Sequence, residues 1–200
     1  MFNSGIKVTD LIEQINSEAD IALDIPDESY VQWLNSLQQL LYTEVIKEQK
    51  KVVLEPPFEN NTIDVSKLSK SGEGKPRFED IHAVYADYTQ LIKSTVTTGV
   101  ILPHTYFKID DRLGFNAKVE KHIAIIYFVK PELINPDEID DSEVIMLPIE
   151  FIDLATSKLR GEAYKLANED ALAAKWLNDY NIHLETFKAW IASKAPSFGL

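Results

Sequence analysis

Four histidines are the first residues of this sequence whose type could do chemistry. They are His82, His104, His122 and His183. None belongs to a His-Glu-x-x-His motif or to another spacing that places two metal ligands on one helix face. Histidines so far apart are typical of exposed or hydrogen-bonded structural positions. We therefore predict no metal site.

Two acidic groupings could bind cations or act as paired carboxylates. The run from Asp137 to Glu143 holds five acids but lacks the Asp-x-Asp-x-Asp-Gly loop and terminal Glu that fold around calcium, which favours a solvated loop. Asp110 and Asp111 are adjacent, so their side chains point away from each other and indicate a surface turn. A hydrolase with carboxylates around Asp110 and Glu120 remains an alternative.

Other catalytic motifs are incomplete, because residues that they require are missing. The stretch from Ser71 to Lys75 resembles a phosphate loop, but only one residue separates its two glycines and Pro76 stands where a magnesium-binding Ser or Thr is needed. The sequence has no Gly-x-Ser-x-Gly elbow and no cysteine, which excludes thiol catalysis, thiolate metal sites and disulfides. We predict a protein that is not an enzyme and binds no cofactor, in a reducing cytosol.

The length and net charge of the chain further limit the class of protein to which it can belong. The chain has 200 residues, is 45% hydrophobic and carries a formal charge of −12, enough apolar material for one domain, or one domain with an insertion. An acidic chain opposes tight binding to phosphate backbones, so any contact with DNA should be loose. No secretory signal opens the sequence, and the seven-residue apolar run Ile123–Val129 is too short to cross a membrane.

Apolar spacing of threes and fours predicts helices at both ends of the chain. One runs from Val8 to about Ala22 and a second from Tyr30 to about Lys51, with the break at Pro26. Pro148 suits the first residue of a third helix, and Asn168 can cap a final helix.

The middle of the chain changes to short alternating runs with frequent Pro and Gly, which predicts β structure. The expected strands are Val52–Glu55, Phe78–Ala86, Gln90–Ile92, Gly99–Leu102, Thr105–Ile109 and Lys121–Val129. Because Ile123 to Val129 is apolar on both faces, it should be the central strand.

The predicted fold class is therefore α+β, a helical bundle from the N- and C-terminal helices with an antiparallel β insertion in the middle. We expect one composite domain with a helical hairpin at 1–50, a β-rich insertion at 51–143 and a helical pair at 144–200 that packs on the first helices. The final helix carries more aromatic residues than one contact needs, which favours association with another subunit.

The order of these parts resembles the head-to-tail adaptor proteins, also called connector or neck proteins, of tailed bacteriophages and prophages. The resemblance lies in three stretches: a strand ending in Tyr127-Phe-Val-Lys-Pro131, an acidic linker, and Leu147-Pro-Ile-Glu-Phe-Ile-Asp-Leu-Ala155 running into Lys158-Leu-Arg-Gly-Glu-Ala-Tyr164 and the segment Asn168–Tyr180. It covers about three quarters of the chain and is strongest from Ile123 to Trp190.

This resemblance implies a non-enzymatic virion structural protein, made in the bacterial cytoplasm and located in the neck of the virion. It would form an oligomeric ring between the portal protein and the next tail component, and would extend the DNA channel. No catalytic residue is carried over. The candidate assembly interface is Lys158, Arg160, Tyr164, Trp176, Tyr180, Phe187 and Trp190, and Lys158, Arg160 and Lys165 are candidates to line the channel.

One alternative from a different class stays open. The β insertion could make the chain a soluble ligand- or carbohydrate-binding module, with a groove lined by Tyr85, Tyr88, Tyr106 and Phe107. Self-association or portal binding favours the adaptor, and saturable ligand binding by a monomer favours the module.

Overall fold

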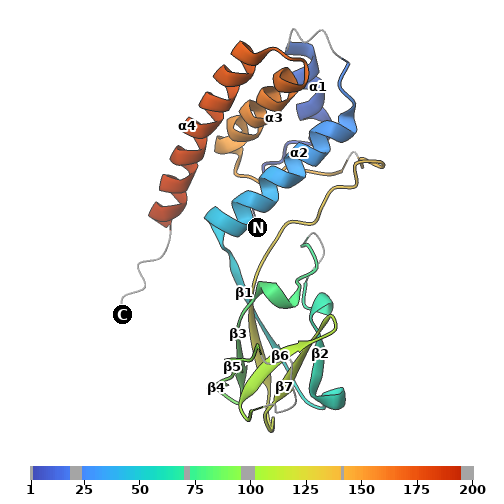
Figure 1. Ribbon diagram of the computed structural model, residues 1–200, viewed down its shortest axis with the longest axis vertical. Helices are drawn as coiled ribbons and strands as arrows, with labels where there is room; N and C mark the ends of the chain where they lie inside the picture. Colours follow the sequence, from blue (N-terminus) through green and yellow to red (C-terminus); the bar gives the residue numbers. More distant parts are fainter. Residues whose placement is uncertain (1, 19–23, 70–72, 96–101, 141, 195–200) are drawn as a thin grey trace. The chain divides into compact units, whose positions relative to one another are not determined.

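The computed structural model describes residues 2–18, 24–69, 73–95, 102–140 and 142–194 (Figure 1). Its contacts divide the chain into two compact units. The helical unit comprises residues 1–46 and 133–200, and the β unit comprises residues 47–132. The predicted α+β class, with helices from both ends and β structure in the middle, is confirmed. The acidic stretch 133–143, which we expected at the end of the β insertion, belongs to the helical unit.

The helical unit is built from four α-helices within the described residues. They are α1 (Val8–Glu18), α2 (Asp27–Leu40), α3 (Ile152–Leu166) and α4 (Asp170–Lys194). The 3-10 turn η5 (Ile149–Phe151) leads into α3, with Pro148 just before it. One apolar core joins the first three helices to α4, and its fully covered residues include Ile15, Leu34, Leu159 and Phe187.

The second helix is shorter than predicted. After α2 the chain makes a π-helical stretch, η1 (Leu41–Ile46), and Lys47 then takes a positive φ of 49°. Lys50 and Lys51, expected in the last helical turns, lie instead in strand β1 (Gln49–Leu54). All six residues of β1 pair with a neighbouring strand, and this ladder outweighs the local helical preference.

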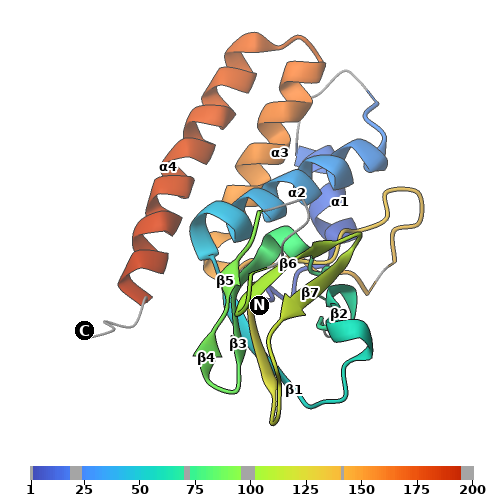
Figure 2. The ribbon, with the colours of Figure 1, turned by 60° about the horizontal axis from the view of Figure 1, so that its bottom comes forward.

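Contrary to the prediction, Asn168 does not cap the final helix. It has a φ of 60° and ends α3 instead, because its N–H donates to Lys165 and the next N–H, of Glu169, donates to Tyr164. These two bonds form the Schellman motif, which favours Asn or Gly at the left-handed position. The turn sends α4 back along α3 (Figure 2).

The β unit contains two four-stranded sheets. The first has the order β1–β8–β3–β4, with β3 (Ile81–Ala86), β4 (Thr89–Gln90) and β8 (Ile123–Phe128), all antiparallel. The second has the order β2–β7–β6–β5, with β2 (Thr62–Asp64), β5 (Ile92–Lys93), β6 (Thr105–Ile109) and β7 (Arg112–Asn116). Within the described residues, only the short β5–β6 pair is parallel. The prediction of a central strand at Ile123–Val129 is confirmed, since β8 lies between β1 and β3.

Strand β7 was not predicted, because Gly114 weakens its pattern. The structure shows why glycine stands there: a Cβ at Gly114 would lie 2.7 Å from Ile109 Cδ1 and 2.8 Å from Phe107 Cε2, both on the paired strand β6. The expected strand Gly99–Leu102 falls mostly outside the described residues, and Leu102 itself is not in a strand.

Buried ion pairs hold parts of the β unit together. Glu73, 7% exposed, pairs with Lys50 of β1, and Asp80, 6% exposed, pairs with Lys130 beyond β8. The hydroxyl of Tyr127 on β8 donates to the carbonyl of Leu68 at 3.0 Å. Among the described helices, none is long and apolar enough to cross a membrane.

Candidate functional site

The candidate assembly residues gather where α3 and α4 pack against each other. Their close approach depends on Gly161, at which an added Cβ would lie 2.7 Å from Leu177 Cδ2. Arg160 projects from α3 and is 9% exposed, and its guanidinium lies 4.7 Å from the ring of Trp176 on α4. The structure thus brings two of the predicted residues into direct contact.

Arg160 also forms an ion pair with Glu18 at the end of α1. The hydrogen bond from Arg160 lowers the pKa of the Glu18 carboxyl below its usual value, and a further bond from Gln14 acts in the same direction. Within the described part of the chain, the Nε atom of Arg160 is buried and has no hydrogen-bond partner. A buried guanidinium nitrogen left without an acceptor carries an energetic cost.

An open cavity of about 330 Å³ lies beside Arg160. Its walls come from α1, α3 and α4 and from Ile6, and its polar lining residues are Gln14, Glu18, Asp153, Thr156, Ser157, Arg160, Asp179 and His183. Three of these are acidic and surround the single guanidinium, so the cavity suits no simple anion. Its acids do not form a metal cluster either, because no group of three or more potential ligands stands together among the described residues.

Lys158 and Tyr180 form a second contact between the helices. Lys158 Nζ lies 5.3 Å from the centre of the Tyr180 ring and donates to Glu162 at 2.6 Å. Burial raises the pKa of the Tyr180 hydroxyl. Two of the three cations proposed for the channel, Lys158 and Arg160, are therefore paired with carboxylates of their own chain, whereas Lys165 is exposed.

The remaining predicted aromatics are used inside the helical unit. Phe187 is fully buried, and its ring lies 5.0 Å from that of Phe151. Trp190 is partly buried against Phe151 and against Phe2, at ring distances of 5.2 and 5.7 Å. Tyr164 is 6% exposed. These side chains complete the core of their own unit and offer little surface to a partner.

The exposed part of α4 is its opposite side, which the sequence pattern did not single out. Of the 25 residues of α4, only Ala173, Tyr180 and Phe187 are buried. Ile182 is 57% exposed and Leu172 39% exposed. The signal that could have identified Ile182 is its position, because it lies about 160° around the helix from the buried stripe, at 100° per residue. We call the exposed residues Ala174, Asn178, Ile182, Glu185 and Ala189 the outer face of α4.

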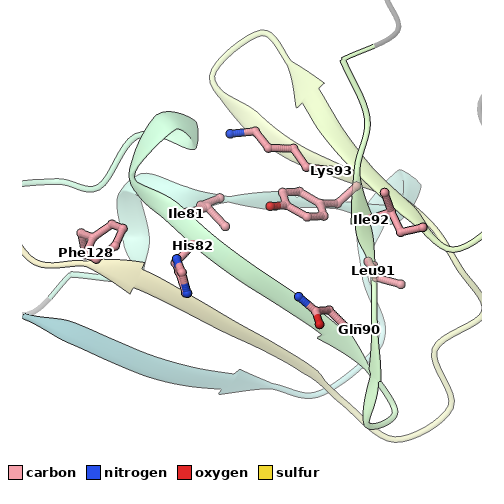
Figure 3. A pocket seen from close by; sticks show the side chains of 8 residues that line it. Ile81, His82, Gln90, Leu91, Ile92, Lys93 and Phe128 are labelled. Carbon is pink, nitrogen blue, oxygen red and sulfur yellow. The ribbon is translucent and has the colours of Figure 1, made fainter. Parts of the chain in front are cut away.

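The β unit has an open pocket of about 610 Å³ between strands of its two sheets (Figure 3). Its lining residues are Ile81, His82, Gln90, Leu91, Ile92, Lys93, Tyr106 and Phe128. Only Tyr106 of the predicted aromatic groove lines it. Tyr88 is 77% exposed at the β3–β4 turn, where its ring lies 4.6 Å from His122.

The carboxylates considered for hydrolysis are not brought together. Asp110 has a φ of 50° in the turn between β6 and β7, whereas Glu120 follows the far end of β7 and pairs with Lys118 at 2.6 Å. This geometry offers no paired acid and base at these two residues.

Comparison with known proteins does not identify the chain: no protein-family model and no curated protein matches its sequence.

Proposed function

We propose that this chain is a non-enzymatic virion structural protein that forms a ring between the portal and the next tail component and extends the DNA channel. The proposal starts from the resemblance of the sequence to head-to-tail adaptors. The structural observation that supports it is the outer face of α4, a long helix that buries only one stripe and leaves Ile182 exposed. Ile182 shares this face with Ala174 and Ala189, and an apolar strip of this kind can be covered by a partner.

Charge favours a second copy of the chain as the occupant of this face. The whole chain carries −12 and its acidic excess lies in the helical unit, so two copies of that unit repel each other. Helix α4 has no net charge, because its three lysines balance its three acids; the charged residues are Asp170, Lys175, Asp179, Glu185, Lys188 and Lys194. Contact through α4 therefore avoids most of the repulsion.

The acidic composition also suits a channel protein. An acidic lumen repels DNA phosphates, so the genome slides without binding tightly. The pairing of Lys158 with Glu162 and of Arg160 with Glu18 removes two cations that would otherwise retain DNA. Contact with DNA would then be loose and insensitive to sequence.

The test is the molar mass of the purified chain by size exclusion with light scattering, alone and after mixing with a portal ring from the same source. We expect the chain to join the portal complex. The variant Ile182→Asp should reduce self-association or portal-bound stoichiometry, because it places a charge in the apolar contact. The control Gln39→Asp adds the same charge at an exposed position of α2.

A chain that stays monomeric and ignores the portal would contradict the proposal. Equal effects of Ile182→Asp and Gln39→Asp would contradict the role of α4. If the chain assembles, reversing the exposed Lys165 tests the channel: unchanged DNA retention would exclude that residue from the lumen.

A second candidate is a soluble ligand-binding module, and the pocket of the β unit is the observation that favours it. Its floor is largely aliphatic, and Tyr106 is only 3% exposed. Sugars stack on open aromatic faces, so this pocket fits a carbohydrate less well than it fits an apolar group with a polar neighbour. Saturable ligand binding by a monomeric chain would favour this candidate.

A further inference from the structure

The pocket of the β unit lies where the chain leaves one sheet for the other. Strands β3 and β4 form a hairpin in the first sheet, paired only at Tyr85–Gln90 and Ala86–Thr89. Leu91 then donates its N–H to Val84 at 2.8 Å, and the next residues form β5 in the second sheet. Ile81 and His82 lie across the pocket from Ile92 and Lys93 (Figure 3).

Two strand edges are open on either side of this pocket. On β3, residues 81–83 have no strand partner on the β4 side among the described residues. On β5, Ile92 and Ser94 donate their N–H groups to the β6 side, at 2.9 and 2.8 Å. Successive N–H groups of a strand point to opposite edges, so that of Lys93 points away from β6. Open edges of this kind accept added strands.

The side chains around the open edges of β3 and β5 are complementary to a ligand that carries an apolar group next to an acidic group. Ile81 and Leu91 provide a buried apolar floor, while Ile92 is 70% exposed at the rim. His82 and Lys93 are the ionisable rim residues, and none of the described lining residues is an acid. Lys93 has no carboxylate partner within the described chain, and its ammonium lies over the Phe78 ring at 4.9 Å.

Tyr106 supplies a hydrogen-bonding group at the pocket. It is one of the lining residues, and it is 3% exposed. Burial raises the pKa of the Tyr106 hydroxyl, so it stays protonated and can donate at neutral pH. A carbonyl oxygen of a peptide bound in the pocket can accept this hydrogen bond.

We propose that this pocket binds an extended peptide segment of another protein, with an apolar side chain on the floor and an acidic residue beside Lys93. The segment adds a short strand along the open edge of β3 or β5. Main-chain hydrogen bonds provide affinity, and the pocket and Lys93 select the side chains. The inference does not depend on the proposed function of α4, which lies in the other unit.

The experiment uses the full chain and a fluorescent, terminally blocked peptide of alternating Phe and Asp, about six residues long to cover the open edge. Binding is followed by anisotropy, and the amide NMR signals of His82, Lys93 and Tyr106 locate the site. We expect saturable binding that shifts these signals. Replacing the central peptide residue by Pro should weaken binding about tenfold or more, because it removes a main-chain donor.

Two variants of the protein test the side-chain contacts. Lys93→Glu should weaken peptide binding about fivefold to tenfold, since it replaces an attraction by a repulsion. Its control, Lys121→Glu, makes the same charge change at an exposed loop position outside the pocket. Tyr106→Phe should weaken binding about threefold to tenfold through the loss of one hydrogen bond.

The proposal is overturned by absence of binding up to about 1 mM peptide, or by equal effects of the two lysine variants. Tighter binding of a peptide with Lys in place of Asp also overturns it. If the Pro peptide binds as well as the parent, or if phenylacetate alone competes as strongly as the peptide, the pocket holds a small apolar acid and not an added strand.

Discussion

The two units of this chain are stabilised in different ways. In the helical unit the carboxylates of the ion pairs are partly or fully exposed, as in Lys158–Glu162, Glu185–Lys188 and Arg160–Glu18, and the interior is mostly apolar, with Phe187 fully covered. In the β unit two carboxylates, Glu73 and Asp80, are buried and paired with lysines. The helical unit therefore depends mainly on packing, and the β unit depends on packing together with buried charge pairs.

The units also differ in what they leave unsatisfied. The helical unit uses its large aromatics internally, exposes a neutral helix face, and leaves the buried Nε of Arg160 without a partner among the described residues. The β unit leaves strand edges open beside its pocket. Abundant aromatic residues thus indicated a core, whereas the candidate recognition features are the groups without an internal partner. This contrast gives three expected outcomes, taken from the largest effect to the smallest.

Phe187→Ala should have the largest effect. Removing a fully buried phenylalanine from a packed core typically costs about 3–5 kcal/mol of unfolding free energy. All three tryptophans, Trp33, Trp176 and Trp190, lie in the helical unit, so tryptophan fluorescence during urea unfolding reports on that unit alone. We expect a lower urea midpoint for the fluorescence transition.

The exposed neighbour Thr186 gives the control, and Thr186→Ala should change stability by less than about 0.5 kcal/mol. Amide exchange extends the comparison to the β unit. The amide of Ile125 on β8 should keep its protection in Phe187→Ala, and an equal loss of protection in both units would show that they unfold as one.

Asp80→Asn should come next and should act on the β unit. Asp80 accepts the N–H of Arg77 at 2.9 Å and pairs with Lys130, and the amide leaves that lysine without its counter-charge. Because Lys130 is partly exposed, the loss should be about 2–3 kcal/mol, below the range for a fully buried pair. The expected result is faster amide exchange at Ile125 with an unchanged tryptophan transition.

The matched control for Asp80→Asn is Glu120→Gln. Glu120 pairs with Lys118 in a contact where both side chains are mostly exposed, and such a pair contributes about 0–1 kcal/mol. Similar losses in the two variants would contradict the view that burial of the carboxylate makes the difference.

The sequence predicted the elements whose periodicity is long or unambiguous. Helices α1, α3 and α4 and the central strand β8 follow directly from apolar spacing. The predicted end of the second helix was wrong because Lys50 and Lys51 have no intrinsic strand preference. Only their pairing with β8 places them in β1. Strand β7 was missed because the reason for Gly114 lies on another strand.

The candidate sites were less predictable than the fold. We predicted Phe187 and Arg160 in an assembly interface from their side-chain types. In the structure Phe187 packs against Phe151, and Arg160 forms an ion pair with Glu18. The pocket near Tyr106 joins residues from five strands or their connections, and no local pattern encodes such a meeting point. Of the residues predicted to line a groove, Tyr106 alone lines this pocket.

The smallest expected effect concerns Asp87, at the turn between β3 and β4. Its carboxylate accepts the N–H groups of Glu120, Lys121 and His122 at 2.7, 2.8 and 2.9 Å. These bonds, first that from Glu120, lower the pKa of Asp87. A carboxyl with a lowered folded-state pKa stabilises the protein above its unfolded pKa, near 3.9, and this contribution is lost as the pH falls through the folded value.

Asp87→Asn removes the charge and keeps a residue type that tolerates the positive φ of 44° at this position. The wild-type protein should therefore be slightly more stable than the variant near neutral pH, and the difference should shrink steadily below about pH 4. Amide exchange of Ile125 in both proteins, measured at several pH values, gives this difference for the β unit. A difference that stayed constant with pH would mean that the shape of the side chain, and not its ionised form, holds the loop between β7 and β8.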